Sequence, residues 1–265
     1  MSFFDIDAGV KRDVTDLLLR KKRWLTLARS DISERYHRSK LGVFWASLSI
    51  LIFVGAVSPI YAHLFGVDVK SYALHFMLGL MVWNFLFTIV MESTDAFIVS
   101  KDLLSSFGMG YTSLIARAVT RNLVVLGYQL MAFLVVTILL GNYPTISWLV
   151  AIPGLLVVVI VGFFLGLLIS IIAARFRDFT ELINNLLRLV FFATPVMWFP
   201  NLKPELQWIV HWNPWYYMIE WIRAPLTSSP LPELILVATT IIFVTTMLVS
   251  LLVLIKVRSR IAFWL

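Results

Sequence analysis

Two arginines near the amino terminus, Arg35 and Arg38, form with Tyr36 the segment of the chain best suited to bind an anionic group. Guanidinium groups bind phosphate oxygens in a bidentate fork. The segment directly precedes a long apolar run, which places it at the depth of lipid headgroups. The same arginines also fit a simpler interpretation, in which they are ordinary basic residues flanking a membrane span.

Ionisable residues within apolar stretches are the second candidate set, because such residues mark ion and substrate paths in membrane proteins. Glu92 and Asp95 lie three residues apart on one helix face, near the end of their apolar segment. They are either interfacial polar residues or part of a proton relay. Arg188 lies inside another apolar segment, where its side chain either extends back to the membrane surface or faces a lumen that carries an anionic substrate.

Tryptophan and proline are concentrated between residues 198 and 225. Two helical pieces are predicted there, 204–212 and 215–223, each about 13–15 Å long at 1.5 Å per residue. Neither piece can cross a hydrocarbon core of about 30 Å. Following a membrane span, they predict either a re-entrant hairpin or an amphipathic cap that lies flat on the membrane surface.

Several kinds of chemistry are excluded by what the sequence does not contain. It has no G-x-x-x-x-G-K-[ST] loop, so the chain does not hydrolyse ATP by that route. It has no cysteine, which excludes disulfides, thiolate metal sites and a cysteine nucleophile. The four histidines are scattered and not at metal-ligand spacing: His37, His63, His75 and His211. We therefore predict no catalytic residue and no metal site.

Composition and charge distribution indicate a multi-pass membrane protein. Apolar residues make up 60% of the 265 residues and charged residues only 14%, with a mean hydropathy of +0.89. A soluble protein has about a quarter charged residues. Of the 22 basic residues, 18 fall on one side of the predicted membrane, which predicts that both termini are cytoplasmic. The formal charge of +7 therefore belongs to a membrane face and not to a nucleic-acid-binding surface.

The elements that must position these residues are predicted to be helices, in an all-α integral membrane fold. Residues 1–40 form a cytoplasmic segment whose apolar residues recur at helical spacing, predicting a helix that lies in the plane of an anionic membrane surface or a solvated cytoplasmic arm. Residues 41–265 form the transmembrane domain, and we expect its first span to act as the insertion signal. The predicted spans are 44–65, 72–99, 114–140, 148–173, 182–199 and 234–255, with a helical hairpin at 200–232 on the outer side.

Four short segments, taken in order along the chain, resemble one known family. They are Asp31–Trp45, with Ser39-Lys40-Leu41-Gly42 before Trp45; Arg175-Phe176-Arg177-Asp178; Thr194-Pro195-Val196; and Trp212–Pro225, with Asn213-Pro214, Glu220 and Arg223. Each motif is short, but four in the right order are specific. The sequence is similar to polysaccharide-export permeases of ABC transporters, which export lipid-linked O-antigen, capsule or teichoic-acid chains, and it is most like the O-antigen permeases.

The resemblance implies a homodimer in the bacterial inner membrane, with two copies of a separate ABC ATPase that hold ATP and Mg²⁺; no cofactor is implied in this chain. The substrate would be an undecaprenyl-linked polysaccharide, whose pyrophosphate Arg35, Tyr36 and Arg38 would receive. The amino-terminal helix and a cytoplasmic loop would contact the ATPase, and aromatic residues of the outer hairpin would stack on sugar rings. The implied loop contacts are Asp102, Leu103, Leu104 and Phe107. The implied channel and gate residues are Arg188, Trp198, Trp208, Trp212, Trp215, Tyr216, Tyr217, Glu220 and Arg223.

Two other functions remain open at this point. One is a membrane-embedded transferase that acts on lipid-linked sugars. It would need a cluster of carboxylates or histidines on one face, and only Glu92 and Asp95 come close. The other is an ABC export permease for drugs or small lipids. The aromatic hairpin favours glycans over such substrates only modestly.

Overall fold

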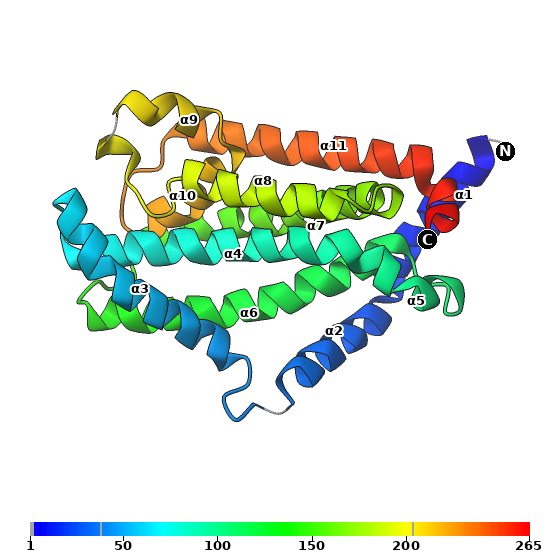
Figure 1. The fold of residues 1–265 in the computed structure, drawn as a ribbon, viewed down its shortest axis with the longest axis horizontal. Helices are drawn as coiled ribbons and strands as arrows, with labels where there is room; N and C mark the ends of the chain where they lie inside the picture. The colour runs from blue at the N-terminus through cyan, green and yellow to red at the C-terminus, as the bar shows by residue number, and fades with distance from the viewer. Residues whose placement is uncertain (1–2, 38, 203) are drawn as a thin grey trace.

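A computed structural model describes residues 3–37, 39–202 and 204–265, and within these ranges the chain forms helices and turns without a β-strand (Figure 1). The longer helices are α1 (Phe3–Leu19), α2 (Lys21–Tyr36), α3 (Phe44–Phe65), α4 (Val69–Val99), α6 (Tyr111–Leu139), α7 (Ala151–Arg175), α8 (Phe179–Ala193), α10 (Pro214–Leu226) and α11 (Glu233–Trp264). The shorter ones are α5 (Lys101–Ser105), η1 (Ile146–Val150), η2 (Pro200–Leu202), η3 (Pro204–Leu206) and α9 (Gln207–His211).

Five helical segments in the described part of the chain are long and apolar enough to cross a membrane: α3, α4, α6, η1 with α7, and α11. The predicted helix 44–65 is observed as α3, which ends at Gly66, where the left-handed φ of 65° suits a residue without a Cβ. The predicted helix 72–99 begins earlier, at Val69, because the Asp68 carboxylate accepts a hydrogen bond from the Ser71 N–H and caps the first turn.

The predicted span 182–199 differs most from the structure. Its helix, α8, runs from Phe179 to Ala193 and has 15 residues, a length of about 22 Å. Thr194 is extended and Pro195 follows it. Because the residue before a proline disfavours the α conformation, the helix ends there. The sixth crossing therefore stays a prediction.

Helix α4 lies at the centre of the bundle and packs against α3, α6, α7, α8 and α10. Small residues bring α7 close to it. A Cβ added to Gly166 would lie 2.6 Å from Ser93 Oγ, and the Ser170 hydroxyl donates a hydrogen bond to the Ser93 carbonyl at 2.7 Å. Close backbone approach and such hydrogen bonds stabilise helix pairs in lipid, where burial of apolar surface provides no driving force.

The two ends of the bundle carry different elements (Figure 1). The amino-terminal arm, α5 and the end of α11 lie at one end, which we call the arm end. The segment from η2 to α10 lies at the other, the hairpin end. The arm forms two helices, α1 and α2, with a break at Arg20. Helix α1 packs against α6 and α11, and α2 packs against α6.

Two buried aspartates of α1 hold the arm on the bundle. Asp13 pairs with Arg258 of α11, whose Nε and Nη2 donate to the two carboxylate oxygens at 2.7 and 3.1 Å. Asp16 accepts hydrogen bonds from the Gly110 N–H at 2.9 Å and from the Ser113 hydroxyl at 2.8 Å. Gly110 is the N-cap residue of α6 and has no side chain to cap it. Asp16 therefore caps α6 from a different helix, where a carboxylate is favoured by the free N–H groups and the helix dipole.

Replacement of Asp16 by alanine is expected to destabilise the docked arm by about 1–3 kcal/mol, because it leaves buried donors of Gly110 and Ser113 without an acceptor. Thermal unfolding of the purified chain in detergent measures the effect. Glu34→Ala, which removes an exposed acidic side chain from the same arm, is the matched control. Equal unfolding temperatures for the two variants would contradict the capping role of Asp16.

Candidate functional site

Five charged residues from three helices meet at the arm end, and we call them the arginine cluster: Asp31 and Arg35 of α2, Glu92 of α4, and Arg117 and Arg121 of α6. Arg117 donates to both oxygens of Asp31, from Nε at 2.7 Å and from Nη2 at 2.5 Å. Arg121 bridges the two carboxylates, donating from Nη1 to Asp31 and from Nη2 to Glu92 at 2.8 Å.

Asp31 is the anchor of this cluster. Partial burial by itself would raise the pKa of its carboxyl group, but hydrogen bonds and positive charge from Arg117 and Arg121 outweigh the burial and hold that pKa below its ordinary value. A carboxyl group with a depressed pKa stabilises the fold above the ordinary aspartate range, and this contribution is lost as the pH falls through the lowered value. Asp31 is therefore ionised at neutral pH and keeps α2 on α6.

Glu92 is the second centre of the cluster. Its carboxylate accepts hydrogen bonds from Arg121, from Arg35 Nη2 at 2.9 Å and from the side-chain amide of Asn122 at 2.9 Å. Asp95, which the sequence groups with Glu92, is exposed and lies outside these contacts. The geometry thus makes Glu92 an ion-pair partner of two arginines.

The candidate phosphate residues are only partly described by the structure. Arg35 is exposed over 53% of its side chain, and Tyr36 is half-buried. Arg38 lies outside the described residues. Sequence reasoning missed Asp31, Arg117 and Arg121. One signal for them was available: Asp31 and Arg35, like Arg117 and Arg121, are four residues apart and share a helix face.

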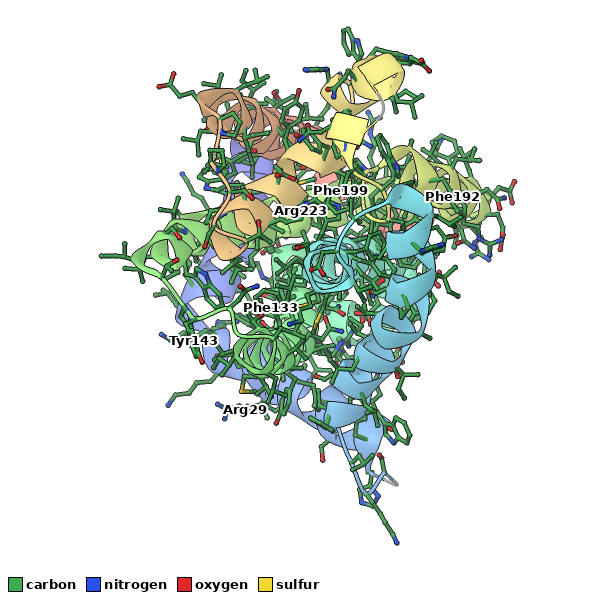
Figure 2. All side chains as sticks on the ribbon, turned by 90° about the vertical axis from the view of Figure 1, so that its left-hand side faces the viewer. Arg29, Phe133, Tyr143, Phe192, Phe199 and Arg223 are labelled. Atoms are coloured by element: carbon green, nitrogen blue, oxygen red, sulfur yellow. The ribbon has the colours of Figure 1, made fainter. Side chains whose placement is uncertain are left out.

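At the hairpin end, Arg223 of α10 is a buried cation with several partners. It is 2% exposed. Its Nε and Nη2 donate to Glu220 Oε2 at 3.0 and 2.5 Å, and Nη1 donates to the Pro195 carbonyl at 2.8 Å. His75 Nε2 lies 3.0 Å from Nη1, and the His75 ring contacts the Phe199 ring at 4.0 Å between centroids. Figure 2, which views the hairpin end, shows Arg223 and Phe199 near the middle of that face.

This arrangement explains physically why two of the sequence motifs occur together. Asn213 caps α10 by accepting from the Trp215 N–H, and its amide donates to the Thr194 hydroxyl at 2.8 Å. Arg223 binds the carbonyl of Pro195. The Thr194-Pro195-Val196 segment and the Asn213–Arg223 segment are thus two halves of one hydrogen-bonded unit that joins α8 to α10, which we call the Arg223 unit.

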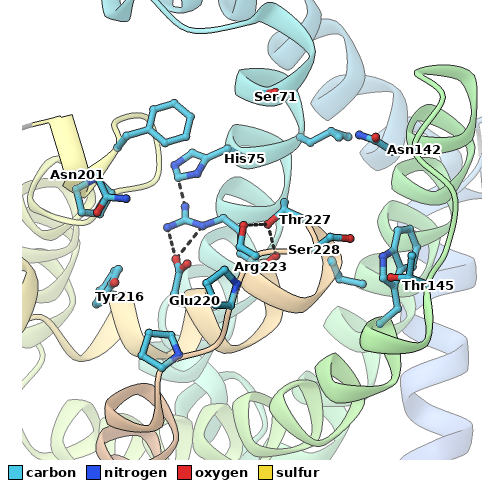
Figure 3. A pocket seen from close by; sticks show the side chains of 18 of the residues that line it. Ser71, His75, Asn142, Thr145, Asn201, Tyr216, Glu220, Arg223, Thr227 and Ser228 are labelled. Carbon is cyan, nitrogen blue, oxygen red and sulfur yellow. Dashed lines mark hydrogen bonds and ion pairs between the residues drawn. The ribbon is translucent and has the colours of Figure 1, made fainter.

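A cavity of about 880 Å³ lies beside Arg223, between the start of α4, the turn after α6 and the end of α10 (Figure 3). Its lining combines aromatic rings with hydrogen-bonding groups: Ser71, His75, Asn142, Tyr143, Thr145, Trp148, Phe199, Asn201, Tyr216, Glu220 and Ser228. Rings together with a few hydrogen-bonding groups are the usual lining of ligand pockets in proteins. No group of three or more acidic or histidine side chains in the described residues could hold a metal ion.

The aromatic residues of the predicted gate differ in how far the chain buries them. Trp208 and Trp212 are exposed at the hairpin end, Trp212 over 85% of its surface, and Trp198 is half-buried. Trp215 and Tyr217 are buried, in a helix that packs against α4, α7 and α11. Tyr216 and Glu220 line the cavity. Arg188 is exposed on α8 and does not line the cavity.

The residues predicted to contact an ATPase lie at the arm end (Figure 1). Asp102 of α5 is exposed, and Phe107, just beyond that helix, is exposed over 71% of its surface. Leu103 and Leu104 are half-buried and pack against the core of the bundle. The loop thus exposes Asp102 and Phe107, while Leu103 and Leu104 attach it to the bundle.

Comparison with known proteins gives the family. The model for the ABC-2 type transporter family matches residues 22–227, which include the arginine cluster, α8 and the Arg223 unit. The chain belongs to the ABC-2 type transporter family. The resemblance inferred from the four sequence motifs is therefore confirmed.

Three curated proteins are similar to the chain. Two, each named O-antigen export system permease protein RfbA, come from Klebsiella pneumoniae; they are 25% and 24% identical over 203 residues, 74% of this chain and 76% of the relative. The third, of the same name, comes from Myxococcus xanthus and is 27% identical over 176 residues, 66% of this chain and 67% of the relative. As an ABC-2 transporter chain, this protein is a component of a membrane transport system.

The Arg223 unit predicts a specific pattern of stability. Arg223→Met is expected to cost about 3–5 kcal/mol, because it leaves the Glu220 charge unpaired in a largely buried site. Arg223→Met combined with Glu220→Gln should recover much of that loss. Thermal unfolding in detergent compares the two, with Glu205→Gln, an exposed carboxylate of the same segment, as the control. A double variant no more stable than Arg223→Met alone would contradict the pairing as the source of the cost.

Proposed function

We propose that this chain is the membrane-spanning subunit of an ATP-driven exporter that moves a lipid-linked, O-antigen-like polysaccharide out of the cytoplasm. The observation that carries the proposal is the family match over residues 22–227, joined by the alignment of three O-antigen export permeases with most of the chain. The five long apolar helices fit a multi-pass protein of the bacterial inner membrane. The substrate travels on an undecaprenyl pyrophosphate carrier.

The energy comes from a partner. Because the sequence has no phosphate-binding loop of its own, ATP and Mg²⁺ bind to two copies of a separate ABC ATPase. Two features of the arm end support a docking surface for that partner. Asp102 and Phe107 project from the α5 loop, and Leu18 and Leu19 are exposed at the end of α1. The arm end is cytoplasmic in this proposal, as the distribution of basic residues predicts.

A second copy of the chain completes the path. Within the fully described helix α8, Leu187 is the one residue that the chain buries. Glu181, Asn185 and Arg188 are exposed and share one helix face by their spacing. Polar groups in contact with lipid are costly, so this face borders a water-filled lumen between two copies. Arg188 there attracts the anionic end of the substrate.

The two candidate sites become the ends of this path. Arg35, Tyr36 and Arg38 receive the pyrophosphate at the cytoplasmic entrance. At the outer end, the exposed Trp208 and Trp212 offer ring faces to sugars, and Tyr216 does so from the cavity. Aromatic faces pack on the C–H groups of many sugars alike, which suits a polymer that passes one residue after another.

Deletion of the gene tests the proposal directly. The strain should accumulate undecaprenyl-linked polysaccharide on the cytoplasmic side and lose the corresponding surface glycan, because no path across the membrane remains. Lipid extraction with glycan analysis measures the first effect, and surface labelling measures the second. A plasmid copy of the wild-type gene should restore export. Normal surface glycan in the deletion strain would refute the proposal.

A further inference from the structure

The arginine at the proposed entrance already has an anionic partner within the chain. Arg35 donates from Nη2 to Glu92 Oε1 at 2.9 Å, and more than half of the Arg35 side chain is exposed. Glu92 is less exposed, at 17% of its side chain. Its other contacts come from Arg121 and Asn122 of α6, so they do not depend on Arg35.

The charges of the arginine cluster leave room for one further anion. Three guanidinium groups face two carboxylates, which gives the cluster a formal charge of one positive unit. Arg117 and Arg121 are held by two hydrogen bonds each to carboxylates, and both are largely shielded from solvent. Arg35 is the exposed member, and an exposed ion pair of this kind is weak. It is therefore the arginine that an incoming anion can take over.

We propose that Glu92 is a displaceable partner of Arg35, which a pyrophosphate group replaces when the substrate enters. The inference rests on the proposed function and assigns Glu92 a role in selecting the substrate. A pyrophosphate has several oxygens and more than one negative charge, so two N–H groups of the guanidinium can donate to it in parallel. Glu92 releases one hydrogen bond and keeps those from Arg121 and Asn122.

This arrangement discriminates between anions. Any ligand of Arg35 has to compete with a carboxylate that is already in place, so a weakly charged headgroup binds less well there than a pyrophosphate does. Asp31 keeps α2 attached to α6 throughout, because its contacts with Arg117 and Arg121 do not involve Arg35. Substrate entry then frees the end of α2 that leads into α3, without releasing the arm.

The test measures binding to the full chain in phosphatidylcholine nanodiscs. The probes are radiolabelled undecaprenyl pyrophosphate in the bilayer and inorganic pyrophosphate in solution. Glu92→Gln removes the competing charge and keeps an acceptor oxygen for Arg121, so it should tighten undecaprenyl pyrophosphate binding about threefold or more. Asp95→Asn removes the same charge from an exposed position on the same helix and should leave binding unchanged.

A double-mutant cycle separates displacement from a general charge effect. Arg35→Ala should weaken binding, and the gain from Glu92→Gln should vanish in the Arg35→Ala background. An equal gain in both backgrounds, or an equal gain from Asp95→Asn, would overturn the proposal. So would weaker or unchanged binding by a Glu92→Gln variant whose thermal unfolding matches the wild type, since that result assigns Glu92 to structure alone.

The two probes distinguish the source of the anion and the level at which the account fails. Binding of undecaprenyl pyrophosphate with the predicted pattern supports a lipid-carrier headgroup. The same pattern with inorganic pyrophosphate alone would overturn the lipid assignment. If the wild-type chain binds neither probe, the entrance assigned under the proposed function is wrong. If it binds undecaprenyl pyrophosphate and Glu92→Gln changes nothing, only the displacement is wrong.

Discussion

The salt bridges of Asp31 with Arg117 and Arg121 determine how the amino-terminal arm relates to the rest of the molecule. Charged groups at the edge of a lipid-embedded bundle are costly unless they are paired. Arg117 and Arg121 of α6 both pair with the Asp31 carboxylate of α2, and Arg121 pairs with Glu92 of α4 as well. Asp13 and Asp16 do the same for Arg258 and for the start of α6. The arm is thereby part of the bundle, because its side chains pair with residues of α4, α6 and α11.

The hairpin end follows the same constraint with a different solution. Arg223 is buried among α10, α4 and the segment after α8, and its charge is balanced by Glu220 and by the Pro195 carbonyl. These hydrogen bonds link α10 to the segment that follows the end of α8, and Arg223 and Glu220 both line the cavity. Between the two ends lie long helices whose described residues are mainly apolar.

Local features were predictable from the sequence where a single residue decides them. Gly66 ends α3 and Pro195 shortens α8, and each acts through its own backbone preference. The proline effect was nevertheless underestimated, since the apolar pattern of residues 182–199 continues across it. The family was also predictable, because its four short motifs occur in the right order along the chain.

Pairings across helices were not predictable, since hydropathy contains no information on which charged residues meet. Asp31 and Glu92, which are 61 positions apart in the sequence and lie on different helices, both pair with Arg121. Burial of aromatic residues was equally hidden. Tryptophan is common both at membrane interfaces and in packed cores, so the spacing of Trp212 and Trp215 could not separate the exposed ring from the buried one.

The central claim is that this chain, powered by a separate ATPase, carries a lipid-linked glycan across a bilayer. Proteoliposomes that contain the chain, its ATPase and an undecaprenyl-linked oligosaccharide test it most directly, with access of an added glycosidase to the oligosaccharide as the readout. The account predicts that ATP changes which side of the membrane the glycan faces, and that a hydrolysis-deficient ATPase abolishes the change. Redistribution of the glycan without ATP, or none with the complete system, would contradict it.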